Sequence, residues 1–176
     1  WDVSNVTSMY HMFDNATVFN GDISSWDVSK VEDMRVMFRN ASAFNQDLPW
    51  DTSSLTQAHH MFESATAFNG NVSGWDLSSV TNMTAMFYNA ASFEGHGLET
   101  WNVSGVQIMN SMFRGTMINA DLSSWDVSSV TDMTQMFRNT QFNSDITSWN
   151  VSNVQSMSAL FYEHTDFNQD ISGWDV

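Results

Sequence analysis

One tryptophan returns along the whole chain every 24 to 26 residues. The stretches WDVSNVTSMYHMF, from Trp1, and WDVSKVEDMRVMF, from Trp26, share eight of their thirteen letters. A period of this length is typical of a solenoid, in which each unit buries its apolar face only against its neighbours. We therefore treat residues 1–176 as one array, with a partial unit from Trp174 and seven full units that begin at Trp1, Trp26, Trp50, Trp75, Trp101, Trp125 and Trp149.

The large apolar side chains occupy a few fixed columns of this repeat. All thirteen Phe fall in two columns, and twelve of the thirteen Met fall in an M-x-x-M pair. With 42% hydrophobic residues, the chain has enough apolar material to fill a core. The Met and aromatic columns are therefore interpreted as core and not as copper or haem ligands.

Each unit combines two hydrophobic periods. W-D-V alternates as a strand does, whereas V-x-x-M-x-x-M-F has the spacing of a short α- or 3₁₀-helix with one buried face. The serine column that precedes this second stretch is predicted to cap the helix. We read the following F-N-x-D-I-S as the return turn.

The asparagines of the return turn form another column. We predict that each side chain bonds to the next coil, as a ladder through Asn20, Asn45, Asn69, Asn143 and Asn168. Glu94 and Ile118 interrupt this column. Irregular loops are therefore expected near residues 94–100 and 117–119.

The whole chain resembles the repeat of about 25 residues found in bacterial surface lipoproteins of the mycoplasma and listeria type and in microalgal surface proteins. Ile23, Trp26 and Val28 also match the L-x-x-L-x-L spacing of treponemal-type leucine-rich repeats. The resemblance implies a right-handed, leucine-rich-repeat-like solenoid of about seven coils, with one short parallel β-strand and a short α or 3₁₀ segment per coil. We expect it to be part of a longer chain or to stack end to end on its own copies.

Charge and composition narrow the classes of function. Twenty Asp and Glu against five Lys and Arg give a net charge of −15, which argues against nucleic acid and anionic membranes as partners. Cysteine is absent, so thiolate sites and thiol nucleophiles are excluded. No apolar run is long enough to insert in a membrane, and no P-loop, H-E-x-x-H or nucleophile elbow is found. We therefore predict a protein that is not an enzyme and has no cofactor.

Two sets of residues remain as candidate sites. Stacked carboxylates repel one another, so the aspartates after the tryptophans are either bonded to turn amides or hold structural calcium, with candidate ligands Asp2, Asp27, Asp51, Asp76 and Asp126. If the source is eukaryotic, N-x-S/T motifs predict glycosylation first at Asn15, Asn40 and Asn82 and also at Asn5, Asn71, Asn102 and Asn150.

The sequence as a whole favours an extracellular or cell-surface repeat scaffold for adhesion or for recognition of a protein or glycan. The alternative is a structural subunit of an extracellular filament that forms when coils stack end to end. Function is expected to lie in the positions that vary from one unit to the next.

Overall fold

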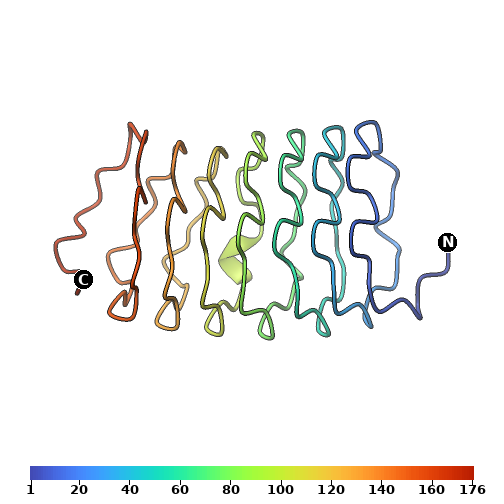
Figure 1. Cartoon of the computed structure of the whole chain (residues 1–176), viewed down its shortest axis with the longest axis horizontal. Coiled ribbons are helices and arrows are strands. Elements are labelled where there is room, and N and C mark those ends of the chain that lie inside the picture. The colour runs from blue at the N-terminus through green and yellow to red at the C-terminus, as the bar shows by residue number, and fades with distance from the viewer.

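The chain winds into successive coils that lie side by side along one axis, as the computed structural model of residues 1–176 shows (Figure 1). Each coil corresponds to one sequence unit, so we number the coils 1 to 7 from the tryptophans that begin them. The two termini lie at opposite ends of the stack (Figure 1). Parallel bridges join Ser8, Asp33 and Gln57 at equivalent places in coils 1 to 3. A second run of bridges joins Asn82, Ile108, Asp132 and Ser156 in coils 4 to 7.

Regular secondary structure is almost absent. The one helix is the 3₁₀ helix η1, Leu98–Thr100, and the pairing between coils consists of isolated bridges instead of strands. The expected strand at W-D-V and the expected helix at V-x-x-M-x-x-M-F do not form as regular elements.

A series of tight turns takes the place of the expected helix. We call this stretch the turn segment; it covers residues 34–41 in coil 2. The amides of Met37, Arg39 and Ala41 donate to carbonyls three residues earlier. The amides between them donate across to coil 3, from Met34, Val36, Phe38 and Asn40. Successive N–H groups therefore alternate between a turn and the neighbouring coil, whereas an α-helix would use all of them internally.

This alternation requires left-handed backbone at two columns of the turn segment. The thirteen non-glycine residues with positive φ all belong to these columns, and their φ values lie between 51° and 61°. One column is rich in asparagine and includes Gly115, residues that tolerate this conformation. The other column is populated by His11, Val36, His60, Ala85, Ser111, Gln135 and Ala159.

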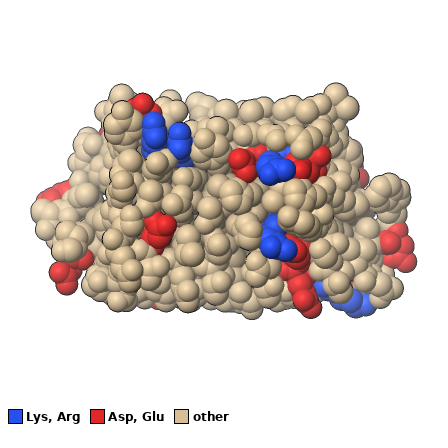
Figure 2. Space-filling view, in the orientation of Figure 1, with Lys and Arg blue, Asp and Glu red and all other residues tan.

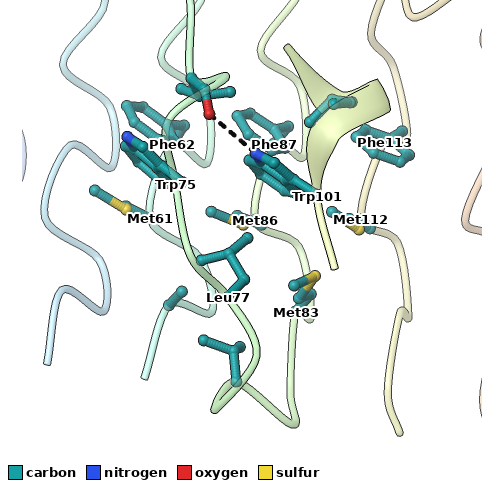
Figure 3. Packing of buried hydrophobic residues seen from close by; sticks show 14 of the residues in the cluster. Met61, Phe62, Trp75, Leu77, Met83, Met86, Phe87, Trp101, Met112 and Phe113 are labelled. Carbon is teal, nitrogen blue, oxygen red and sulfur yellow. Dashed lines mark hydrogen bonds between the residues drawn. The ribbon is translucent and has the colours of Figure 1, made fainter. Parts of the chain in front are cut away.

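Three stacks of aromatic rings run along the axis and form the core. The Trp75 and Trp101 centroids lie 6.1 Å apart with planes 6° from parallel, and the Phe62 and Phe87 centroids lie 5.4 Å apart. Each indole from Trp50 onward also donates to a backbone carbonyl that lies two or three residues before the preceding tryptophan, as Trp101 Nε1 does to Val72 O at 3.0 Å (Figure 3). Stacking and indole bonds therefore set the coil spacing together.

Aspartate, not serine, is the capping residue of the turn after W-D-V. The Ser29 amide and hydroxyl both donate to Asp27 Oδ1, at 3.1 Å and 2.7 Å. The same hydrogen bond, from the serine backbone amide to the Asp or Asn side chain two residues earlier, is formed by Ser4, Ser53, Ser78, Ser104, Ser128 and Ser152. The predicted serine caps are therefore wrong in their chemistry, because the serine is the donor and the preceding side chain is the acceptor.

The asparagine ladder is confirmed in coils 1 to 3. Asn20 Oδ1 accepts from the Asn45 amide at 2.9 Å, and Asn45 Oδ1 accepts from the Asn69 amide at 2.9 Å. Asn69 then accepts from Glu94, where the ladder stops. It resumes at Asn119, which accepts from Asn143, and continues to Asn168. The predicted interruption at Ile118 is therefore wrong, because Asn119, the next residue, fills the column in coil 5.

Candidate functional site

The interruption of the asparagine ladder opens the largest hollow of the molecule. The hollow measures about 830 Å³ and lies over the return turns of coils 2 to 6. We call it the break hollow. It includes both loops that were expected to be irregular, and it is lined by Asp47, Asn69, Asn71, Glu94, Gly95, His96, Gly97, Glu99, Met117, Asn119, Ala120, Asp121 and Gln141.

Two glycines allow the backbone to turn at this break. Gly95 and Gly97 have φ values of 97° and 94°, in the left-handed region that favours glycine. A Cβ on Gly97 would clash with the backbone of Ser73, and one on Gly95 would clash with Ile118. The extra residue of the 26-residue unit is thus accommodated by close packing on coils 3 and 5, and η1 follows directly.

The lining of the break hollow is polar and negatively charged. Asp47, Glu94, Glu99 and Asp121 are all exposed there, and no Lys or Arg is among the lining residues. His96 Nε2 lies 3.4 Å from Glu94 Oε2, with both side chains about half exposed. A bond from the Ser123 hydroxyl and one from its amide lower the pKa of Asp121. These carboxylates therefore attract cationic groups or accept hydrogen bonds from hydroxyl and amide donors.

The five candidate calcium ligands lie in one column along the stack. Each of Asp2, Asp27, Asp51, Asp76 and Asp126 accepts a hydrogen bond from the serine amide two residues later. For Asp27, the bond from the Ser29 hydroxyl is the main cause of a lowered pKa. No group of three or more His, Cys, Asp or Glu side chains in the chain is arranged to hold a metal ion. Calcium at this column stays a prediction, and the turn amides already satisfy part of each carboxylate.

The candidate glycosylation sites differ in how their amide nitrogens are used. Asn40 is half-buried and donates from Nδ2 to Asn15 Oδ1 at 3.0 Å, and Asn15 donates to Asp14 at 2.9 Å. Asn82 is half-buried, with its Oδ1 bonded to the Thr84 amide. The more open sites expose the side chain and use only Oδ1 in a bond, at Asn5, Asn71, Asn102 and Asn150. If glycans are present, the structure ranks these four above the first three.

A second group of charged residues lies on the turn segments, and the sequence alone did not single it out as a site. Arg39 donates to both carboxylate oxygens of Asp14 in the preceding coil, at 2.9 Å and 2.7 Å. These bonds are the main cause of the lowered pKa of Asp14. Arg114 and Arg138 occupy the same column and lie over the rings of Tyr88 and Tyr162. Figure 2 shows a few Lys and Arg side chains on one face of the molecule, most of them next to Asp or Glu side chains. The sequence does contain a signal for this group: residues of opposite charge, or an Arg and a Tyr, occupy the same column in adjacent coils.

Fold and site together define a repeat protein of stacked coils whose apolar core is continuous and whose polar surface is interrupted at one break. The chain belongs to the family described as Mycoplasma protein of unknown function, DUF285, which matches residues 1–97 and 91–176. No curated protein and no solved structure matches the chain. None of its helices has the length and apolar character needed to cross a membrane.

Proposed function

We propose that the protein is a non-catalytic recognition scaffold of the extracellular space or cell surface, and that the break hollow is where it binds a partner. The observation that carries this proposal is the contrast between core and surface at the break. Trp101 and Phe93 stay buried in their stacks, while the return turns open into a hollow of about 830 Å³. A surface can vary in this way only because the core does not depend on it.

The charge of the break hollow selects the partner. Four exposed carboxylates with no Lys or Arg among them complement a Lys- or Arg-rich protein segment, and the net charge of −15 would draw such a segment from a distance. The amide and carboxylate oxygens would also accept hydrogen bonds from glycan hydroxyls.

The lining of the break hollow consists mainly of groups that accept hydrogen bonds and attract cations, which supports a binding role. The lining combines one histidine with carboxylates, and neither Ser nor Cys lies in it to act as a nucleophile. We also propose that the chain is a right-handed solenoid. In the same proposal it is related to listeria-type and microalgal surface repeats and to treponemal-type leucine-rich repeats.

The test uses hexalysine as the probe and isothermal titration as the measurement. The double variant Glu94→Gln, Glu99→Gln removes two charges from the break hollow; Asp145→Asn, Asp170→Asn removes two charges from the return turns outside it. We expect the first variant to weaken hexalysine binding at least ~10-fold more than the second, because it removes two close ion pairs. Equal losses would show that the general field of the protein binds the peptide, and the assignment to the break hollow would be wrong.

The alternative role, a filament subunit, is favoured by the end coils. Trp1 is 88% exposed, and the last coil carries an apolar hollow of about 520 Å³ lined by Phe161, Ile171 and Trp174 among others. A second copy would cover such faces, and a further coil of the same chain would cover them equally. Size-exclusion chromatography and negative-stain imaging distinguish the two roles: end-to-end polymers would replace the scaffold proposal with the filament.

A further inference from the structure

Arg114 is the one arginine of the chain without a carboxylate partner. Arg35, Arg39 and Arg138 each lie within 4.0 Å of an Asp or Glu oxygen, whereas Arg114 donates only to the amide oxygen of Gln135. This is unusual in a chain with twenty acidic residues. The guanidinium is half-buried and keeps donors that no group of the chain uses.

The neighbours of Arg114 make this an anion-binding position. In its column, Asp14, Arg39 and Glu63 alternate in sign over coils 1 to 3, whereas Tyr88, Arg114, Arg138 and Tyr162 follow in coils 4 to 7. The Arg114 guanidinium carbon lies 5.1 Å from the centroid of the Tyr88 ring, and that of Arg138 lies 4.7 Å from Tyr162. Two adjacent arginines are thus held by tyrosines, and only Glu163 offsets their charge.

Arg114 faces a hollow of about 310 Å³ on the turn segments of coils 3 to 5. We call it the turn-face hollow; besides Arg114 it includes His60, Glu63, Thr84, Tyr88 and Asn110. Its size is at the lower limit of small-molecule sites, about 300 Å³, and suits one sugar ring. Thr84 uses its amide, which donates to Asn82 Oδ1, and its hydroxyl remains available to a ligand.

The opposite wall of the turn-face hollow restricts the ligand further. Glu63 lies two coils from Arg114, and His60 Nδ1 holds its carboxylate at 2.8 Å. A polyanion would be repelled by Glu63, whereas a ligand with one carboxylate and several hydroxyls satisfies both walls. The carboxylate would bind Arg114 and a hydroxyl would donate to Glu63.

We infer that the turn-face hollow binds an acidic sugar of the uronic or sialic acid class through Arg114. This site goes beyond the recognition of a basic partner at the break hollow, since it lies on other residues and selects the opposite charge. A glycan carboxylate would bind in two contacts to the guanidinium, with the ring against the Tyr88 side of the hollow.

The test compares methyl glucuronide with methyl glucoside, its neutral counterpart, by ligand-observed NMR and isothermal titration. We expect saturable binding of the glucuronide, no measurable binding of the glucoside, and at least ~10-fold weaker glucuronide binding in Arg114→Gln. Arg39→Gln removes an equal charge from the same column and should leave the affinity within ~2-fold. Thermal melting of both variants confirms that they fold.

Three outcomes would overturn the inference: equal binding of the two sugars, equal losses in the two arginine variants, or binding of an acidic dipeptide but not of the glucuronide. The last would make Arg114 an anchor for a protein carboxylate. Measuring hexalysine binding by Arg114→Gln tests the break-hollow proposal separately from the sugar-site inference. That binding should persist whether or not the sugar site is correct, because Arg114 does not line the break hollow.

Discussion

The left-handed backbone at Ala85 allows a test that distinguishes the turn segment from the helix that its sequence suggests. Ala85 has a φ of 51° and is 6% exposed, whereas Ala90, five residues later in the same coil, is fully buried and does not have positive φ. Each is replaced by glycine. In a helix both changes would destabilise, since glycine costs about 1 kcal/mol against alanine.

In the turn structure, the two substitutions are expected to change the free energy of unfolding by different amounts. Both lose a buried methyl group, worth about 0.8 kcal/mol, and both gain unfolded-state entropy, worth about 0.4 to 1 kcal/mol. Only Ala85→Gly also relieves the left-handed conformation, which costs roughly 1 to 2 kcal/mol for a residue with a Cβ. We therefore expect Ala90→Gly to lose about 1.5 kcal/mol and Ala85→Gly to remain near the parent protein.

Differential scanning calorimetry provides the measurement. At about 2 to 4 °C per kcal/mol for a chain of this size, Ala90→Gly should lower Tm by about 3 to 6 °C, and Ala85→Gly should shift it by less than about 2 °C. Ala159→Gly, with a φ of 54° and a less buried methyl group, should raise Tm. Losses of equal size in Ala85→Gly and Ala90→Gly would refute the left-handed turn at this column.

Three further predictions concern the ladder, the pH and calcium. Asn45→Ala removes the acceptor of the Asn69 amide and should cost about 1 kcal/mol in urea unfolding, whereas Asn45→Asp keeps an acceptor and should cost less. Burial lowers the pKa of His59 and of His164, so the unfolded chain takes up protons first as pH falls below about 6.5. Stability should then decrease below that pH, and again near pH 4 and below, where aspartates such as Asp27 with lowered pKa are protonated in the unfolded chain before the folded one. A Tm that stays constant between pH 7 and pH 5 would contradict the histidine assignment. Calcium chloride should raise Tm no more than sodium chloride of equal ionic strength; a larger, saturable rise would show that the aspartate column binds calcium.

The core and the coil boundaries were readable from the sequence because the columns of Trp, Met and Phe can stack only in register. Every Phe of coils 2 to 6 is fully buried, as the column rule requires. The asparagine ladder was readable for the same reason, since Asn20, Asn45 and Asn69 recur at the period of the repeat, 25 and 24 residues apart. The interruption near Glu94 followed from the extra residue of that unit.

The turn segment could not be read in the same way. Apolar residues three apart suit both a short helix and a series of three-residue turns, so the M-x-x-M spacing does not choose between them. The column from Asn15 to Asn139 offered the better signal, because asparagine and glycine favour left-handed backbone. The column that contains Val36 offered none. For the serine column, sequence spacing could not show which of two neighbouring polar side chains accepts the bond.

The candidate site could be predicted only in part from the sequence, for a related reason. The loops at Glu94 and Asn119 were predicted separately, but their meeting in one hollow depends on the return turns of neighbouring coils facing the same way. The lack of a carboxylate partner at Arg114 is invisible in one sequence, since it depends on which side chains of adjacent coils come within reach.

The stacked indoles have a consequence for spectroscopy. In five of the seven neighbouring pairs, the tryptophan rings lie 6.0 to 6.4 Å apart with planes between 4° and 15° from parallel, close enough for their electronic transitions to couple. The backbone, by contrast, has one three-residue helix and no strand to give an ordinary far-ultraviolet circular dichroism signal. A fully folded sample would therefore lack the usual helix and sheet bands in that spectrum, and its order would be visible in the bands of the coupled tryptophans.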